Sequence, residues 1–325
     1  MQELDYKKFS DYFYMYAVPV LKKYEQERRV VNNLYNFLEI FSGLLFICAI
    51  LLAIFGLQFA VSTPAGRMYS DYIGFAFVIP FLIGGLAKLI RKNFQKKIKE
   101  KVYGEIFEKF GLSYHNSLSE KASAEKNIRY ICENSDILSR YDNINIDDII
   151  KGEYNGLPFT IYDADIFYYT SGKHRKRVTV FRGVFLAAKI NKNFKSETLI
   201  QMDTGSNPKK VGQKVQVKLE DIEFEKLFEV YSTDQIDARY ILTTAFMERL
   251  KDFVTQKRYP IEVLFSKRTY MEENVFFFFD TRRDHFEINI KRSLMDKNTL
   301  FDVLWEVSRM LKVIEALKLD QNIGL

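Results

Sequence analysis

The stretch FLEIFSGLLFICAILLAIFGLQFAV at residues 37–61 decides how this chain is organised. A second apolar stretch, YIGFAFVIPFLIGGLAKLI, follows at residues 72–90. Each provides about 20 residues, enough for an α-helix to cross the roughly 30 Å hydrocarbon core of a membrane. Neither has an ionisable side chain near its middle, where one would indicate an ion or proton pathway. We therefore expect a transmembrane hairpin that serves as an anchor.

Basic residues flank the two spans unequally. They are Lys22, Lys23, Arg28 and Arg29 before the first span, and Lys88, Arg91, Lys92, Lys96, Lys97, Lys99 and Lys101 after the second. Between the spans, residues 62–71 carry only Arg67. Because positive charge in short flanking segments stays inside the cell, we expect two spans with both termini cytoplasmic. A cleaved signal peptide is not expected, since the first apolar run begins late and is too long.

The helices are expected to continue beyond the membrane as an antiparallel stalk. Residues 91–111 carry apolar side chains at a four-residue spacing, and Gly111 suits a C-terminal cap. A matching helix is expected to begin near Pro19, because proline fits a first turn, with a separate short amphipathic helix upstream. The expected parts are residues 1–36 (cytoplasmic helices and first stalk helix), 37–90 (transmembrane hairpin), 91–111 (second stalk helix) and 112–325 (cytoplasmic domain).

Composition agrees with a membrane anchor joined to a sizeable soluble part. The formal net charge is +6, and much of the excess follows the second span, which favours an anionic membrane surface over nucleic acid as the partner. The two cysteines, Cys48 and Cys132, can form neither a disulfide framework nor a four-thiolate zinc site. A reducing, cytosolic environment fits the soluble part.

The chain beyond residue 112 predicts an α+β domain with a mostly antiparallel sheet. β-Branched and aromatic residues concentrate in short runs bounded by turn residues. The predicted strands are 159–169, 178–190, 198–202, 215–218, 228–232, 263–266, 275–280 and 286–290. The predicted helices are 119–131, 244–256 and 299–319, with Thr243 as the N-cap of the second. Residues 142–146 are expected to form a loop.

Several motifs resemble a known family in their order and spacing. They are RYD (140–142), DIIKG (148–152), FRGVF (181–185), NKNF (191–194), VYSTDQIDARYILT (230–243) and FMERL (246–250). Over residues 140–319 the chain resembles the bacterial membrane family catalogued as domain of unknown function 3137. Thr244 departs from the pattern, where members usually have proline. The resemblance implies a bacterial inner-membrane protein with a cytoplasmic domain, and it brings no activity or catalytic residue with it.

Catalytic and cofactor motifs find little support in the sequence. The three histidines, His115, His174 and His285, are far apart and show no His-Glu-x-x-His spacing. The glycines form neither a phosphate-binding loop nor a dinucleotide fingerprint. We expect no catalytic residue, no metal site and no cofactor.

Two pairs of aspartates are the alternative to that expectation. Asp163 and Asp165 share one face of a predicted strand, and Asp234 and Asp237 flank a strand-to-helix junction. Such a pair could bind a divalent cation or share a proton. More often it marks a solvated face or a capped turn.

A basic cluster is predicted at the tip of the first hairpin. It comprises Lys173, Arg175, Lys176 and Arg177, with Lys209 and Lys210 in a later loop. Each basic residue near an anionic bilayer contributes about 1 kcal/mol of attraction, so the tip is a candidate site for anionic lipid headgroups or an acidic partner. Nucleic acid is not expected, because no aromatic residues are interleaved for base stacking. The alternative is a solvated turn that protects a sheet edge.

A polar loop is the second candidate site. It comprises Asp234, Gln235, Asp237 and Arg239. Arg239 could bind an acidic partner in a bidentate manner. Alternatively, the aspartates satisfy turn amides and Arg239 pairs with one of them.

The sequence favours a membrane-anchored cytoplasmic binding or scaffold module for an unidentified protein partner. One alternative is a membrane-surface enzyme with a carboxylate or divalent-metal site. Another is a small oligomeric channel or transport accessory built from the hairpin. Whether the chain forms a homo-oligomer is left open.

Overall fold

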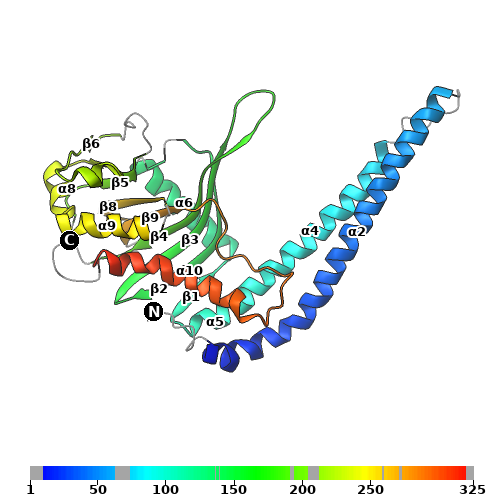
Figure 1. Cartoon of the computed structure of the whole chain (residues 1–325), viewed down its shortest axis with the longest axis horizontal. Helices are drawn as coiled ribbons and strands as arrows, with labels where there is room; N and C mark the ends of the chain where they lie inside the picture. The colour runs from blue at the N-terminus through cyan, green and yellow to red at the C-terminus, as the bar shows by residue number, and fades with distance from the viewer. Residues whose placement is uncertain are drawn as a thin grey trace. The chain divides into compact units, whose positions relative to one another are not determined.

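The computed structural model describes residues 10–62, 74–135, 137–138, 140–190, 194–203, 212–257, 260–270 and 273–319. The chain is an α+β protein with two long apolar N-terminal helices and an antiparallel sheet (Figure 1). It divides into two compact units. The helical unit comprises Ser10–Tyr103 and Ile288–Thr299, and the sheet unit comprises Gly104–Glu287 and the chain from Leu300 onward.

The first long helix is continuous from Ser10 to Ser62. It consists of a π-helical turn, η1 (Phe13–Ala17), and α2 (Val18–Ser62). The prediction of a separate upstream helix and a new start near Pro19 is therefore wrong. Proline has no backbone N–H to donate, and the π-turn shifts the hydrogen bonding just before it, so that the Val18 N–H bonds to the Phe13 carbonyl. The helix can thus pass through Pro19 without ending.

The second long helix packs antiparallel to the first. It comprises η2 (Gly74–Phe77), α4 (Val78–Ile98) and η3 (Lys99–Tyr103), and α5 (Gly104–Glu108) follows. Ser42 Oγ donates to the Pro80 carbonyl over 2.7 Å, and a Cβ at Gly84 would lie only 3.2 Å from that hydroxyl. Nearer the N-terminus of α2, Lys97 pairs with Glu27 over 2.6 Å. Of the predicted segment between the spans (62–71), residues 63–71 lie outside the described residues.

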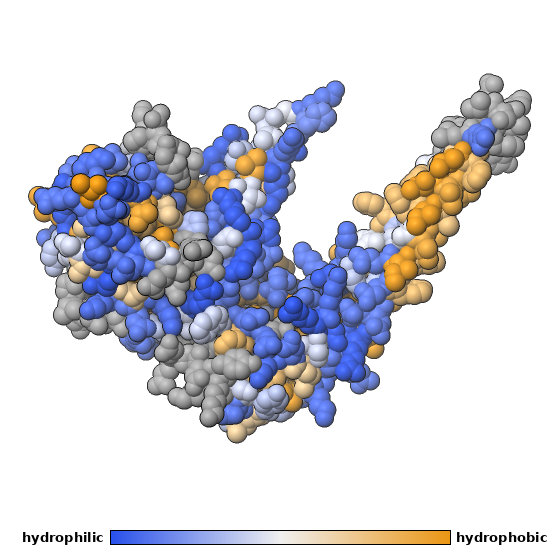
Figure 2. Space-filling view, in the orientation of Figure 1, coloured by the Kyte–Doolittle hydropathy of each residue, from blue (hydrophilic) through white to orange (hydrophobic). Residues whose placement is uncertain are grey.

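Both long helices expose apolar side chains. Ser10–Gly56 and Gly74–Glu108 are long and apolar enough to cross a membrane by length and composition. Figure 2 shows an almost continuous apolar surface along much of this pair. Phe37, Phe55 and Phe81 are 62%, 66% and 82% exposed, respectively. In water such a surface would be costly, because burying one large apolar side chain is worth about 1.5–3 kcal/mol.

Residues 288–299 pack on the helices of their own unit. Arg28 Nη1 donates to the Ile290 carbonyl over 2.7 Å, and Gln95 Nε2 donates to the Ile288 carbonyl over 2.8 Å. The predicted strand at 286–290 is therefore wrong. Its alternating pattern reflects burial of Ile288 and Ile290, while two of its carbonyls accept from side chains of the long helices.

The sheet unit contains nine strands in the order β1-β2-β3-β4-β9-β8-β5-β7-β6, and every pairing among the described residues is antiparallel. The strands are β1 (Leu112–His115), β2 (Asn143–Tyr154), β3 (Leu157–Tyr169), β4 (Arg177–Ala188), β5 (Thr198–Met202), β6 (Val215–Gln216), β7 (Phe228–Ser232), β8 (Ile261–Tyr270) and β9 (Glu273–Asp280). The helices are α6 (Leu118–Ser135), α7 (Ile222–Glu225), α8 (Gln235–Ile241), α9 (Thr244–Lys257) and α10 (Lys297–Ala316).

Helices cover both faces of the sheet. Ile128 and Ile131 of α6 share one buried cluster with Tyr162 and Ala164 of β3. Asp163 lies between those two strand residues and therefore faces the opposite side, where its carboxylate accepts the backbone N–H of His285 over 3.0 Å. Since the His285 ring contacts α10, that helix lies on the face opposite α6 (Figure 1).

The loop predicted at 142–146 is wrong, because residues 143–146 begin β2, which pairs with both β1 and β3. A β-bulge between Ile146 and Asp148 inserts one residue and breaks the two-residue alternation that identifies a strand. Other predictions are confirmed. The strands at 198–202 and 228–232 have the same bounds as β5 and β7. Thr243 caps α9 by accepting the Phe246 N–H over 3.2 Å.

Candidate functional site

The hairpin between β3 and β4 carries the predicted basic cluster. The Thr170 N–H donates to the Lys176 carbonyl over 2.9 Å and closes the tip, which projects beyond the sheet (Figure 1). Arg177 forms an ion pair with Asp165, and its guanidinium lies 3.8 Å from the centre of the Phe167 ring. Arg175 lies 5.4 Å from the centre of the Tyr169 ring. Lys209 and Lys210 lie outside the described residues.

A third arginine, which the sequence reasoning did not include, joins this surface. Arg140 lies 4.3 Å from the centre of the Tyr168 ring, so the three consecutive aromatic residues at 167–169 each contact a guanidinium. Cation–π contact and the Asp165 ion pair thus occupy the arginines. Among the described residues, no ion pair involves Lys173 or Lys176 of the tip.

The predicted polar loop forms the start of α8, a helix that the sequence analysis did not anticipate. Asp234 is its N-cap and accepts from the Ile236 and Asp237 N–H groups over 2.8 and 3.2 Å. Asp237 accepts from the Ser196 N–H over 2.8 Å and from the Ser196 hydroxyl over 2.6 Å. These contacts fix the helix on the segment that leads into β5.

Arg239 and Gln235 complete this arrangement. Arg239 donates to the Gln235 carbonyl over 3.2 Å, to the Gln235 side-chain oxygen over 3.3 Å and to the Lys218 carbonyl over 3.0 Å. All four predicted loop residues therefore meet around α8. The same helix exposes two large side chains that the sequence reasoning missed, Ile236 at 82% and Tyr240 at 72%.

Of the two predicted strand carboxylates, Asp163 lies in a buried polar layer beneath α10, whereas Asp165 pairs with Arg177 of the hairpin. Asp163 is 2% exposed, and burial raises the pKa of its carboxyl well above the usual range, with Asp148 contributing in the same direction. The His285 ring Nδ1 lies 2.7 Å from a carboxylate oxygen of Glu306 on α10, and its Nε2 contacts the Thr281 hydroxyl. These internal contacts join the β9–α10 connection to the sheet. Among the described residues, no group of three or more His, Cys, Asp or Glu side chains could hold a metal ion.

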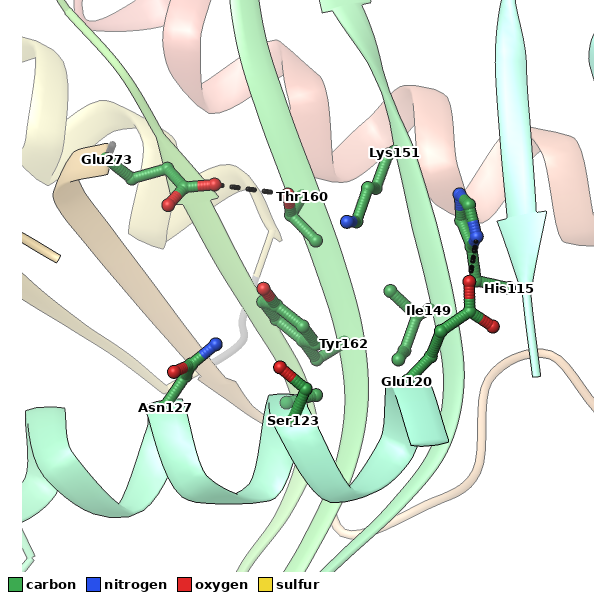
Figure 3. Close-up of a pocket in the computed structure, with 10 residues that line it drawn as sticks. His115, Glu120, Ser123, Asn127, Ile149, Lys151, Thr160, Tyr162 and Glu273 are labelled. Atoms are coloured by element: carbon green, nitrogen blue, oxygen red, sulfur yellow. Dashed lines mark hydrogen bonds and ion pairs between the residues drawn. The ribbon is translucent and has the colours of Figure 1, made fainter. Parts of the chain in front are cut away.

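A polar cavity of about 180 Å³ lies on the opposite face of the sheet, beside α6 (Figure 3). Its polar lining includes Ser123, Asn127, Lys151, Thr160, Tyr162 and Glu273. Lys151 and Thr160 are direct cross-strand partners in β2 and β3, so their side chains project on the same side. Ser123 and Asn127 are four residues apart on α6 and point toward the strands (Figure 3).

A capping box sets one wall of this cavity. The Ser117 hydroxyl accepts from the Glu120 N–H over 3.3 Å, and a Glu120 carboxylate oxygen accepts from the Ser117 N–H over 3.2 Å. The other Glu120 oxygen contacts the His115 ring. Hydrogen bonds from Ser117 and His115 lower the pKa of Glu120. Glu120 is therefore ionised and engaged with its own chain.

A hydrogen-bonded pair forms the opposite end. Thr160 Oγ1 donates to a Glu273 carboxylate oxygen over 3.1 Å. Burial raises the pKa of the Tyr162 hydroxyl, and the nearby charge of Glu273 acts in the same direction. The phenol thus stays protonated. Besides the engaged Glu120 and His115, the cavity therefore offers the Lys151 cation, the Glu273 carboxylate and neutral donors within one small space.

The sequence analysis missed this cavity because its residues come from four separated segments. The Ser-x-x-Glu pattern at residues 117–120 is a capping-box signature that predicts the start of a helix. Thr160 is a polar residue on an otherwise apolar strand face, and the sequence alone shows this. Neither signal shows that Glu273 lies beside Thr160.

Comparison with known proteins places part of the chain. Residues 179–319 match the family described as "Protein of unknown function (DUF3137)", which confirms the predicted resemblance. No curated protein matches. Among solved structures, the chain is similar to the mycobacterial trehalose monomycolate transport factor A, TtfA. The identity is 10% and the TM-score is 0.30, over 55% of this chain and 77% of that one. A score of this size does not establish a shared fold.

Proposed function

From the premise that residues 179–319 form a DUF3137 domain of unknown function, we propose that this protein is a membrane-tethered docking module. The long helices anchor it in the bacterial inner (plasma) membrane, with both termini cytoplasmic. The sheet unit binds a cytoplasmic protein partner through the exposed face of α8.

The surface of the long helices supports the tether. Large apolar side chains are exposed on both α2 and α4, and their candidate spans meet the length and composition of membrane helices. Lysines and arginines gather outside the spans, on the side toward the sheet unit along the chain. By the positive-inside rule this side is cytoplasmic.

The observation that carries the docking function is the exposed face of α8. Ile236 and Tyr240 are four residues apart on the helix, so their side chains are neighbours on one face. Asp234 and Asp237 fix the backbone of this helix through the bonds described above. A rigid helix that presents an aromatic and an aliphatic side chain resembles the anchors that contribute most to binding energy in protein interfaces.

The test is purification of the full-length chain from its native host in mild detergent, followed by mass spectrometry and metal analysis. We compare the wild type with the double variant Ile236→Ser/Tyr240→Ser. Leu118→Ser is the matched control, because Leu118 is 78% exposed at the start of α6. The proposal predicts a stoichiometric partner with the wild type and the control, lost with the double variant. The same partner with all three would contradict the α8 assignment, and a metal-loaded chain with no partner would favour an enzyme.

The basic tip of the β3–β4 hairpin provides a second contact in this proposal. Arg175 and Arg177 lie over the β3 rings of Tyr169 and Phe167 in the same hairpin. Lys173 and Lys176 are the exposed lysines beside them. These lysines suit anionic lipid headgroups at the membrane surface.

A further inference from the structure

The polar cavity beside α6 has two ends of opposite charge. Lys151 supplies an ammonium at one end, and Glu273 supplies a carboxylate at the other, with Thr160 and Tyr162 between them (Figure 3). We propose that this cavity binds a small zwitterion of amino-acid size. The ligand's carboxylate faces Lys151, and its ammonium faces Glu273.

The acidic end is built from buried groups. Glu273 and Thr160 are 8% and 5% exposed, and the Thr160 hydroxyl orients the carboxylate through a 3.1 Å hydrogen bond. A carboxylate held in this way in a partly desolvated site forms a strong charge-assisted hydrogen bond with an ammonium group. The protonated Tyr162 hydroxyl adds a neutral donor nearby.

The basic end is accessible from solvent. Lys151 is exposed, and its amine is drawn toward Thr160 and Tyr162 in Figure 3. The acidic residue on the same wall, Glu120, is engaged by Ser117 and His115. Among the described residues no ion pair involves Lys151, so its charge is available to a ligand carboxylate.

The size and the middle of the cavity select a small polar molecule. A volume of about 180 Å³ holds more than a single water, yet it is below the roughly 300 Å³ typical of pockets for drug-sized ligands. Ser123 and Asn127 on α6 provide a hydroxyl and an amide that point toward the strands across the cavity (Figure 3). These groups suit a ligand whose short body carries a further polar group.

The paired charges also disfavour other ligand classes. A lone anion would meet the carboxylate of Glu273, and a lone cation would meet the ammonium of Lys151. Like-charge contact lowers affinity and so gives selectivity. A zwitterion satisfies both ends at once.

The test measures binding to the full-length chain in detergent by isothermal titration calorimetry and by thermal shift. The probes are the common L-amino acids, with propionate, propylamine and glucose as monoanionic, monocationic and neutral comparisons. Lys151→Met and Glu273→Gln each remove one charged contact. Lys126→Met is the matched control, because Lys126 is exposed on α6 and does not line the cavity.

We expect at least one amino acid to bind at millimolar or lower concentration, and each cavity variant to weaken it about tenfold to a hundredfold, the effect of one charge-assisted hydrogen bond. The control should bind as the wild type does. Absence of amino-acid binding, equal binding by the cavity variants, or tighter binding of propionate, propylamine or glucose would overturn the proposal. If Glu273→Gln fails to fold, Lys151→Met decides, since its side chain is exposed. The inference does not depend on the docking function, and its failure would leave that function untouched.

Discussion

The buried ion pair between Glu25 and Arg28 gives a prediction that can be worked through from the structure. Both side chains are 9% exposed, and Arg28 donates to the two Glu25 carboxylate oxygens over 2.9 Å. The pair also holds residues 288–299 against α2. Arg28 donates to the Ile290 carbonyl over 2.7 Å, and the Leu294 N–H donates to Glu25 over 2.9 Å.

The pKa shift of Glu25 gives the size of the stabilisation that this ion pair provides. Burial alone would raise this pKa, but hydrogen bonds from Arg28, the Leu294 amide and Arg29 outweigh burial and lower it from 4.5 to about 2. At 1.36 kcal/mol for each pH unit, the difference stabilises the folded state by about 3 kcal/mol. Because the folded pKa lies below the unfolded value, this stabilisation is present above about pH 4.5. It is lost as the pH falls toward 2.

The perturbation is Glu25→Gln, which leaves the buried Arg28 charge without its carboxylate. Opening of residues 288–299 should become about 3 kcal/mol easier, which raises the open population about a hundredfold. Trypsin cleavage after the exposed Lys291 and Arg292 reports this opening, since cleavage follows the open population when reclosing is fast.

Glu27→Gln is the control on the same helix. Glu27 pairs with Lys97, but the two side chains are 40% and 51% exposed, so the pair is worth at most about 1 kcal/mol. Equal cleavage rates for Glu25→Gln and Glu27→Gln would refute the reasoning. A second check is hydrogen exchange at the Leu294 amide, corrected for intrinsic rates. At pH values below about 4.5, the protection of this amide should decrease in the wild type but not in Glu25→Gln.

Three further predictions concern the sheet unit. Asp163→Asn should raise the melting temperature at neutral pH. The pKa of Asp163 is raised in the folded state, so its carboxylate increasingly destabilises the fold as the pH rises above the ordinary value of 3.8. A lower melting temperature, or an unchanged pH profile of thermal unfolding, would contradict this. Gly183→Ala would place a Cβ 2.1 Å from the Phe279 carbonyl oxygen, so we expect a loss of about 3 kcal/mol or more in chemical denaturation, and a loss below about 1 kcal/mol would show that the β4–β9 pairing can shift. Lys173→Ser/Lys176→Ser should weaken flotation of the isolated soluble domain (residues 112–325) with anionic liposomes relative to Lys189→Ser/Lys218→Ser. Equal flotation at low salt would exclude the lipid contact.

The sequence predicts the long helices well and the first part of the sheet poorly. The apolar runs within α2 and α4 are long enough that their length and composition together identify both helices. In β2, the bulge after Ile146 interrupts the alternation that marks a strand. At 286–290 the alternation is present, yet the backbone bonds to Arg28 and Gln95 instead of a neighbouring strand. Local patterns show which side chains are buried but not which partner satisfies the backbone.

The candidate sites also differ in how much of each could be predicted from the sequence. The basic tip and the polar loop are contiguous in the sequence, so their residues could be found directly. That Asp165 pairs with Arg177, and that Asp237 binds the segment before β5, depends on strand register and long-range contact. The polar cavity depends even more on tertiary structure, since Lys151, Thr160 and Glu273 come together only in the folded sheet. Periodicity carries no information about such contacts.

The most direct test of the central claim, a membrane tether that places the sheet unit in the cytoplasm, is cysteine accessibility in intact cells. Cys48→Ser/Cys132→Ala removes the native thiols, and single cysteines are then introduced as Ser70→Cys between the spans and Lys173→Cys in the β3–β4 hairpin. The account predicts that a membrane-impermeant maleimide labels the Ser70→Cys protein in intact cells and the Lys173→Cys protein only after permeabilisation. Labelling of the Lys173→Cys protein in intact cells, or recovery of the chain in the soluble fraction, would contradict it.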